Sequence, residues 1–274
     1  MPSRIPNTEE NNICEDYKNR RLTRNEISIK YGHCRQTIAK ILKRNNIPIH
    51  KRKGHPIIKC NENYFETIDT PAKAYYLGFI AGDGSICDQE SALVINLAVK
   101  DEQFLKDFLI ALDSDHSIYK RNDFHKKTQK TYEGRSVKIA RSKMAEDLTR
   151  HGVGSNKSKE LSISPTIPVY LIRHFIRGII DSDGCWSISG NRINCGFLSS
   201  VESFSVEVST ILIKECDLRS VKILPRPGCF EIRWTGNSQC KRIYDYLYGD
   251  GGPYLQRKYD LSTNHFNSLD AKIS

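Results

Sequence analysis

The chain has 274 residues, of which 38% are hydrophobic and 27% charged, a composition typical of a folded protein with two or three domains. No apolar run approaches the roughly 20 residues that span a bilayer, and the N-terminus has no apolar stretch of signal-peptide type. The nine cysteines are scattered without a Cys-x-x-Cys motif. We therefore expect a cytoplasmic protein with reduced, mostly buried thiols, and no membrane anchor, disulfide framework or zinc module.

Positive charge is concentrated in two blocks. Residues 1–60 contain 14 Lys and Arg against 5 Asp and Glu, and residues 116–160 contain 12 against 5, although the net charge of the whole chain is only +10. Such blocks are typical of proteins that bind a polyanion, but a solvated basic surface has the same composition. The density of the first block favours nucleic acid as the partner.

Residues 9–46 predict three short helices. Thr23 can cap the second helix with Glu26 three residues later, Gly32 can form the following turn, and the third helix begins near Arg35. This is a helix-turn-helix pattern, which we assign to a domain at 1–47, with any small helical bundle as the alternative. Its candidate DNA contacts are Arg35, Gln36, Thr37, Lys40, Lys43 and Arg44. A basic, proline-containing linker at 48–70 follows.

From residue 71 onward, the same order of helices and strands is predicted twice, in two halves that we place at 71–165 and 166–274. In the first half we expect helices at 71–83, 101–112 and 143–151, with strands from 85 and at 93–99, 117–124 and 136–142. In the second half we expect helices at 169–183, 204–216 and 237–248, with strands at 185–189, 192–199, 219–224 and 229–235. The fold class is therefore α+β.

The first helix of each half carries the repeated segment, at 75–86 and again at 175–186. Each segment is an apolar run closed by Asp-Gly, and the two are 100 residues apart. Small residues recur four apart, at Gly78 and Gly82 and at Gly178 and Ser182, so that one face of each helix is free of large side chains. We expect these two faces to pack against each other as the interface between the halves.

Parallel packing of these helices would bring Asp83 and Asp183 together at two negative helix ends. Two like charges there are unfavourable without a cation, and Mg²⁺, with Mn²⁺ as an alternative ion, suits a site of carboxylate oxygens. The carbonyls of Gly82 and Ser182 are further candidate ligands. The competing interpretation is that Asp-Gly merely ends each helix. Asp181 has no counterpart, because Ala81 stands in the first half, and we expect it to be structural.

Residues 76–84 and 176–184 resemble the two motifs of the LAGLIDADG (DOD-type) homing endonucleases in their single-chain form, and the resemblance covers roughly 70–260. It implies two pseudo-symmetric αββαββα halves with saddle-shaped antiparallel sheets, preceded here by a small all-α domain. It also implies a monomeric, Mg²⁺-dependent nuclease that cuts both strands of a long DNA site across the minor groove and leaves 3′ extensions. By this resemblance the catalytic residues are Asp83, Asp183, Lys157 and Lys258.

The sheets of such a protein would read bases in the major groove. Candidate contacts are Arg121, Lys138 and Arg141 in the first half, and Arg192, Lys222, Arg226 and Arg233 in the second. One departure from the family is that Val99 stands where some relatives have a polar residue near the metal, whereas the second half has Ser199. The two half-sites are therefore expected to be unequal.

Other functions remain open at this stage. The same fold could serve as an RNA-splicing maturase or as a DNA-binding regulator without nuclease activity, and a helix-turn-helix regulator with an unrelated sensor domain would leave the repeat unexplained. An intein is disfavoured, because the chain begins with Met-Pro and shows no splicing nucleophile there. The target sequence and an origin in intron homing are not encoded in any motif of the chain.

Overall fold

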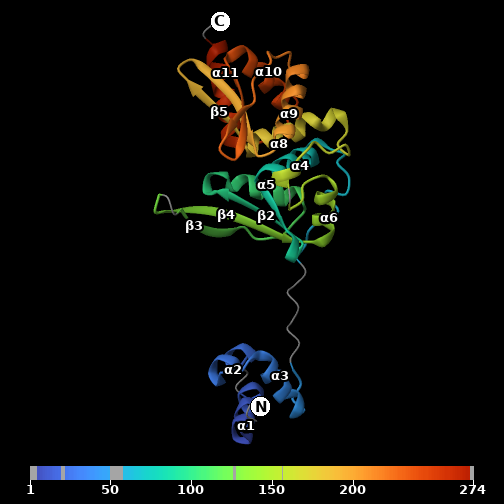
Figure 1. The fold of residues 1–274 in the computed structure, drawn as a ribbon, viewed down its shortest axis with the longest axis vertical. Coiled ribbons are helices and arrows are strands. Elements are labelled where there is room, and N and C mark those ends of the chain that lie inside the picture. Colours follow the sequence, from blue (N-terminus) through green and yellow to red (C-terminus); the bar gives the residue numbers. More distant parts are fainter. Residues whose placement is uncertain (1–4, 20–21, 50–57, 126–127, 156, 272–274) are drawn as a thin grey trace. The chain divides into compact units, whose positions relative to one another are not determined.

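The computed structural model describes residues 5–19, 22–49, 58–125, 128–155 and 157–271. The chain divides into two compact units, Met1–Ile57 and Ile58–Ser274, drawn in Figure 1. Residues 50–57 of the predicted linker lie outside the described residues, whereas its later part belongs to the second unit, where Tyr64 and Phe65 are buried. No helix in the described ranges has the length and apolar character to cross a membrane.

The N-terminal unit has three helices, α1 (Asn7–Lys18), α2 (Arg24–Tyr31) and α3 (Arg35–Arg44). The predicted capping box is present. The Thr23 hydroxyl accepts a hydrogen bond from the Glu26 amide, and the Glu26 carboxylate accepts one from the Thr23 amide. Gly32 ends α2 at φ +69°, where a side chain would be strained. Burial of five aliphatic side chains, Ile13, Ile27, Ile38, Ile41 and Leu42, holds the three helices together.

The second unit contains two four-stranded antiparallel sheets, each followed by helices, in the predicted α+β arrangement. The elements of the first half are α4 (Pro71–Asp83), β1 (Gly84–Cys87), β2 (Ala92–Ala98), α5 (Glu102–Ala111), β3 (Tyr119–His125), β4 (Lys130–Ala140), α6 (Ser142–Arg150) and α7 (Lys157–Glu160). The elements of the second half are α8 (Ile172–Ser182), β5 (Gly184–Ser189), β6 (Arg192–Ser199), α9 (Glu202–Glu215), β7 (Leu224–Arg226), β8 (Cys229–Thr235), α10 (Asn237–Tyr248) and α11 (Gln256–Asp270).

The two sheets have the same topology, with strand orders β1-β2-β4-β3 and β5-β6-β8-β7. Strand residues alternate between two faces. One face of each sheet is apolar and covered by helices, for example through Ile95, Val137, Ile232 and Trp234, all at most 1% exposed. The opposite face carries charged and polar side chains together with a few exposed apolar ones, such as Leu198 and Leu224, and no helix covers it within the described part of residues 58–274. We call this uncovered side the open face of each sheet.

Two predicted strand boundaries are wrong, and two helices of the second unit, α7 and α11, were missed. The segment between the strands expected at 117–124 and 136–142 is largely strand as well, because β3 and β4 continue pairing from Tyr119 opposite Ser136 to His125 opposite Lys130. The strand expected at 219–224 is shorter and later, at Leu224–Arg226, and joins β8 through a turn at Pro227-Gly228 with Gly228 at φ +78°. Helix α11 was not predicted, although it carries Lys258.

Candidate active site between the two halves

Helices α4 and α8 pack against each other between the two sheets (Figure 1). The small residues permit this approach. A Cβ atom on Gly78 would lie 2.0 Å from the Phe175 carbonyl oxygen, and one on Gly178 would lie 2.2 Å from the Tyr75 carbonyl oxygen. Real Cβ atoms do not approach backbone so closely, so both glycines are required by the contact.

Both motif aspartates lie at the C-terminal ends of these helices. Asp83 is the last residue of α4, and Asp183 directly follows α8. A Cβ on Gly82 would lie 1.9 Å from the Ser182 hydroxyl and 2.9 Å from the Asp183 carboxylate, so each helix end contacts the other. The parallel arrangement expected from the repeat is therefore present.

The environment of the two carboxylates disfavours their charge. Each side chain is open to solvent on one side, while the helix ends crowd the other. Partial dehydration raises the pKa of Asp83, and dehydration together with the neighbouring Asp83 raises the pKa of Asp183 to about 6. Two carboxylates that hinder each other's ionisation favour a bound cation.

Both predicted lysines lie at these helix ends. Lys157 Nζ donates to the carbonyl oxygens of Ile80, Ala81 and Gly82 at 2.6–2.9 Å. Lys258 Nζ donates to the carbonyls of Ile180, Ser182 and Gly184 at 2.5–3.2 Å. Dehydration lowers the pKa of both amines, that of Lys157 to about 8. The lysines thus satisfy helix-end carbonyls, a structural role that could account for them without any chemistry.

These contacts change the expected metal site. The carbonyls of Gly82 and Ser182 already accept hydrogen bonds from ammonium groups, whose charge opposes a metal ion on the same oxygens. The carboxylates of Asp83 and Asp183 do fit Mg²⁺, which commonly binds through one or two carboxylates and otherwise keeps water. Among the described residues no cluster of three or more His, Cys, Asp or Glu side chains could hold an ion. A metal here would therefore rest on the two aspartates.

Asp181 is buried beneath this site and is structural in the way the sequence indicated. It is 0% exposed and accepts from the hydroxyls of Tyr75 and Tyr248 at 2.9 and 2.7 Å and from the Leu255 amide at 2.7 Å. One turn earlier on α8, Arg177 donates to the carbonyls of Leu247 and Gly251. Asp181 and Arg177 thus hold both ends of segment 247–255, which leads directly into the helix bearing Lys258.

Sequence reasoning missed the role of Arg177. Leu77 stands at its place in the first half, which was a detectable signal of a second asymmetric position. Arg257, adjacent to Lys258, was also missed. Its Nε lies 2.8 Å from Oδ1 of Asp101 in the first half, a carboxylate only 6% exposed. This ion pair connects α11 to the opposite half.

The candidate DNA contacts on the sheets divide into those on the open faces and those elsewhere. The strand register places Arg121 and Lys138 on the open face of the first sheet, and Arg192, Arg226 and Arg233 on that of the second. Arg141 lies beyond β4 and donates to the carbonyl of Ile58, so the structure directs it away from the sheet. Lys222 is exposed but precedes β7.

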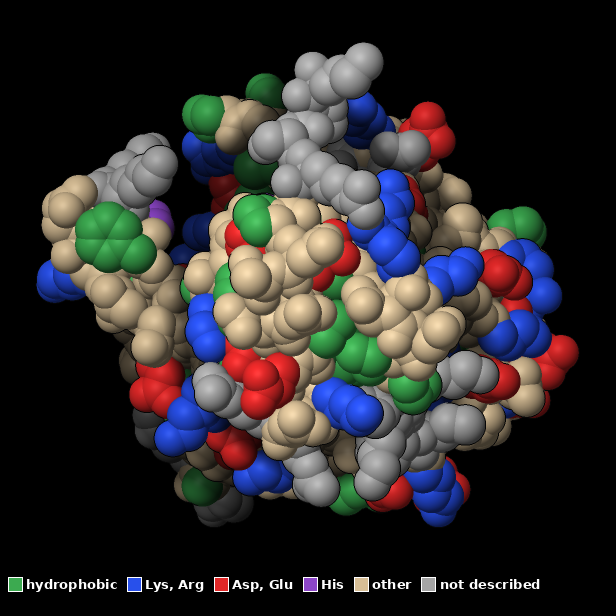
Figure 2. Space-filling model, turned by 90° about the horizontal axis from the view of Figure 1, so that it is seen from below, with side chains coloured by type: hydrophobic (Ala, Val, Ile, Leu, Met, Phe, Trp, Pro, Cys, Tyr) green, Lys and Arg blue, Asp and Glu red, His purple; other side chains and the backbone are tan. Residues whose placement is uncertain are grey.

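Many of the basic side chains are paired with acidic ones. Lys138 pairs with Glu90, and Arg121 pairs with Asp123. Figure 2 shows one face of the molecule, on which blue Lys and Arg side chains lie beside red Asp and Glu side chains. The basic block in the sequence therefore overstates the unpaired charge available to a polyanion.

The candidate contacts of the helix-turn-helix unit gather on α3. Arg35, Gln36, Lys40 and Lys43 are exposed there, opposite the buried Ile38 and Ile41. The remaining two have partners within the unit, since Thr37 Oγ1 contacts Cys34 Sγ and Arg44 pairs with Glu10. Four adjacent polar side chains thus remain available on one face of α3.

No protein-family profile matches the chain. It is 42% identical over 71 residues to an uncharacterized protein, MJ0314, of Methanocaldococcus jannaschii; that match covers 26% of this chain and spans only about a quarter (27%) of the relative.

Among solved structures, the homing endonuclease I-WcaI bound to its DNA recognition sequence is similar, with a TM-score of 0.52 and 12% identity over 76% of this chain and 95% of that one. The N-terminal LAGLIDADG domain of DUF199/WhiA matches with a TM-score of 0.45 and 14% identity over 68% of this chain and 87% of that one. The similarity to I-WcaI and the repeated motif agree, and the chain has the LAGLIDADG fold.

Proposed function

We propose that this protein is a site-specific, metal-dependent endonuclease of double-stranded DNA. The observation that carries the proposal is the junction of α4 and α8, where the aspartates of the two related halves come together and where dehydration and the charge of Asp83 raise the pKa of Asp183 to about 6. When both carboxylates are ionised they repel each other, and a bound cation would offset that repulsion. The similar endonuclease, which binds DNA, supports the choice of substrate.

Asp83 and Asp183 would hold Mg²⁺, which when bound supplies charge neutralisation at a phosphate and activation of water. Lys157 and Lys258 lie beside the carboxylates and could turn from the helix-end carbonyls toward a phosphate entering between the sheets. Two further carboxylates near the junction are engaged elsewhere, since Asp101 pairs with Arg257 and the buried Asp181 accepts three hydrogen bonds, so neither is available as a general base. Since each half contributes one aspartate and one lysine, one centre could serve both strands.

DNA would lie along the open faces of the two sheets. Their strands present Arg121, Lys138, Arg192, Arg226 and Arg233, and α3 of the N-terminal unit offers a separate set of contacts for flanking sequence. A single chain with two halves has no need of a second copy, so we propose a monomer.

The test begins by selecting a target from duplexes with a randomised segment, through binding to the full chain. A supercoiled plasmid carrying the selected sequence is then incubated with Mg²⁺ and either the wild-type protein, Asp83→Asn or Asp183→Asn. We expect linear product from the wild type and a loss of about 10²-fold or more in each variant. Undiminished cutting by both variants would exclude the proposed metal site.

A non-cleaving DNA-binding protein, either a regulator or a maturase, is the second candidate. The observation that favours it is that both lysines are engaged by main-chain carbonyls. Wild-type protein that selects a sequence but neither nicks nor linearises it with Mg²⁺ or Mn²⁺ would support this candidate. A splicing assay with an intron RNA would then separate a maturase from a regulator.

A further inference from the structure

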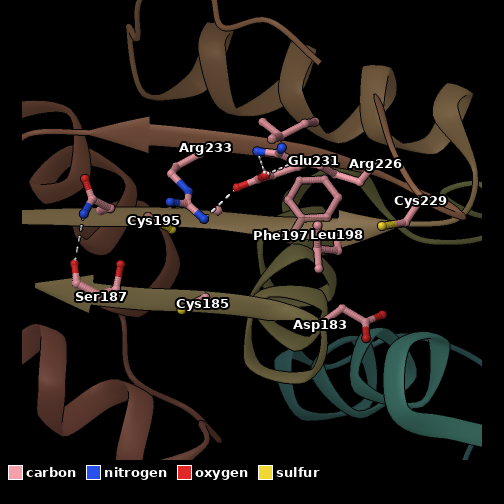
Figure 3. Close-up of a pocket in the computed structure, with 13 residues that line it drawn as sticks. Asp183, Cys185, Ser187, Cys195, Phe197, Leu198, Arg226, Cys229, Glu231 and Arg233 are labelled. Carbon is pink, nitrogen blue, oxygen red and sulfur yellow. Dashed lines mark hydrogen bonds and ion pairs between the residues drawn. The ribbon is translucent and has the colours of Figure 1, made fainter. Parts of the chain in front are cut away.

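The open face of the second sheet carries a cluster of three charged side chains, Arg226, Glu231 and Arg233 (Figure 3). Arg226 directs its Nε and Nη2 to Glu231 Oε2 at 2.7 and 2.6 Å, and Arg233 Nη2 lies 2.6 Å from Oε1. The Glu231 side chain is only 11% exposed because two guanidinium groups lie against it. Both arginines pull the pKa of this carboxyl below its usual value.

The first sheet repeats this arrangement with different residues. Arg121 lies on β3, the outer strand that corresponds to β7, and both its Nε and its Nη2 contact Asp123 Oδ1. Its aliphatic stem crosses Gly134 on the neighbouring strand, where a Cβ would lie 3.1 Å from the Arg121 Cγ. In both halves, then, a carboxylate holds one edge of an arginine on the outermost strand.

This geometry leaves a defined part of each guanidinium free. The Nε/Nη2 edge is occupied, whereas Nη1 of Arg121 and of Arg226 makes no hydrogen bond among the described residues. The end of the fork, Nη1 with the second hydrogen of Nη2, can donate two parallel bonds. Two parallel acceptors, N7 and O6, are what guanine presents in the major groove.

Neither fold stability nor charge balance explains the repetition well. Exposed ion pairs of this kind stabilise a fold by little, and a carboxylate on a DNA-facing surface reduces affinity for every sequence alike. A carboxylate that restricts an arginine to one orientation does, however, lower the entropy lost when the arginine binds a base. The arrangement is therefore better suited to recognising a particular base than to attracting DNA of any sequence.

A cavity of about 320 Å³ adjoins the second cluster. Its lining includes Asp183 at one end and Arg226, Glu231 and Arg233 at the other. Figure 3 shows the carboxylate of Glu231 between the two arginines, above the strand that leads from Asp183. The cluster is therefore continuous with the candidate active site along the same open face.

We propose that Arg121 and Arg226 each read a guanine in their own half of the target duplex, and that Asp123 and Glu231 are positioning residues that hold them for this contact. The inference rests on the proposed function, since it presupposes that the open faces meet DNA. Beyond the proposed function, the inference states which side chains determine sequence specificity and which base they select.

The experiment is selection of full-length protein on duplexes with a randomised segment, in EDTA so that metal-dependent cutting removes no bound DNA, followed by sequencing. We expect the wild type to prefer guanine by about tenfold or more at one position in each half of the site. Asp123→Asn should reduce that preference to about twofold in one half only, and Glu231→Gln in the other half only. Arg226→Lys, which keeps the charge but loses the fork, should act like Glu231→Gln.

Glu133→Gln is the matched control. Glu133 lies on the same hairpin as Asp123 but, by strand alternation, on the opposite face, where it pairs with Arg135. Removing its charge should leave both guanine preferences intact, and thermal melting should confirm that every variant folds.

If Asp123→Asn and Glu231→Gln keep both preferences and merely strengthen binding to all sequences, the two carboxylates do not position the arginines and the inference fails. Wild-type enrichment of a sequence without such guanines would also overturn it, while leaving the proposed function standing. Failure of the wild type to enrich any sequence would overturn the proposed function and the inference together.

Discussion

The two halves share a topology but hold their lysines differently. In the second half, Arg177 and Asp181 fix segment 247–255, and Lys258 follows on the long helix α11, where it is 5% exposed. The first half has Leu77 and Ala81 at the matching positions, and Lys157 begins the four-residue helix α7. The comparison teaches that a duplicated fold can keep its chemical groups in place while only one copy keeps a rigid support for them.

The strongest test of this asymmetry is Asp181→Ala. The change leaves three buried donors without an acceptor, and we expect a loss of about 4 kcal/mol in the free energy of unfolding. Urea denaturation measures it, with Asp181→Asn expected to lose less and the exposed Asp260→Ala to change stability little. A loss below about 1 kcal/mol for Asp181→Ala would mean that the buried carboxylate does not support the second half.

Gly78→Ala and Gly178→Ala test the part of the molecule that is symmetric. Each adds a Cβ about 2 Å from a backbone oxygen of the opposite helix, so both should cost about 3 kcal/mol and to a similar extent. Gly154→Ala is the control, because its Cβ would meet only ordinary contacts at 3.4 Å or more. If the two variants lost markedly different amounts of unfolding free energy, the contact between α4 and α8 would be asymmetric as well.

Replacing each lysine with methionine compares the two supports directly. Lys258→Met should lower the free energy of unfolding by about 2 kcal/mol and Lys157→Met by about 1 kcal/mol, since the first removes hydrogen bonds from a more deeply buried amine. Lys241→Met, in an exposed pair with Asp245, is the neutral reference. Faster amide exchange in α7 than in the first turn of α11 would agree; the reverse order would contradict the comparison.

The smallest expected effect concerns acidity. In metal-free protein, carbon NMR should show Asp183 titrating near pH 6, and Asp83→Asn should lower that midpoint because a neighbouring negative charge is removed. The sign for stability follows. The folded protein binds the Asp183 proton more tightly than the unfolded chain does. Protonation of Asp183 therefore adds to the free energy of unfolding below about pH 4, and this stabilisation is lost as the pH rises through about 6. A midpoint unaffected by Asp83→Asn would mean that the carboxylates do not interact.

Local patterns in the sequence predicted much of this structure. The capping box at Thr23, the turn at Gly32 and the helix over 237–248 follow from short-range rules and occur as expected. The small residues of the repeat likewise predicted the contact between α4 and α8, since close backbone approach requires them. The LAGLIDADG fold was recognisable from two nine-residue segments.

What the sequence did not reveal depends on pairing between distant residues. The length of β3 and β4 is set by cross-strand hydrogen bonds rather than by β propensity. The contacts of Lys157 and Lys258 with helix-end carbonyls, and the pairing of Arg226 with Glu231, are set by tertiary distance. Residue types suggested which groups gather at the junction, but not what each would bind.

The hydrogen bond from Tyr75 to Asp181 has an evolutionary consequence. Its donor belongs to one half and its acceptor to the other, and the matching positions hold Phe175 and Ala81, which cannot form it. A dimer of two first halves would lack the carboxylate. A dimer of two second halves would bury the carboxylate without the tyrosine hydroxyl that donates to it. If the gene arose by fusion of identical copies, this exchange of side chains would have made the fusion hard to reverse.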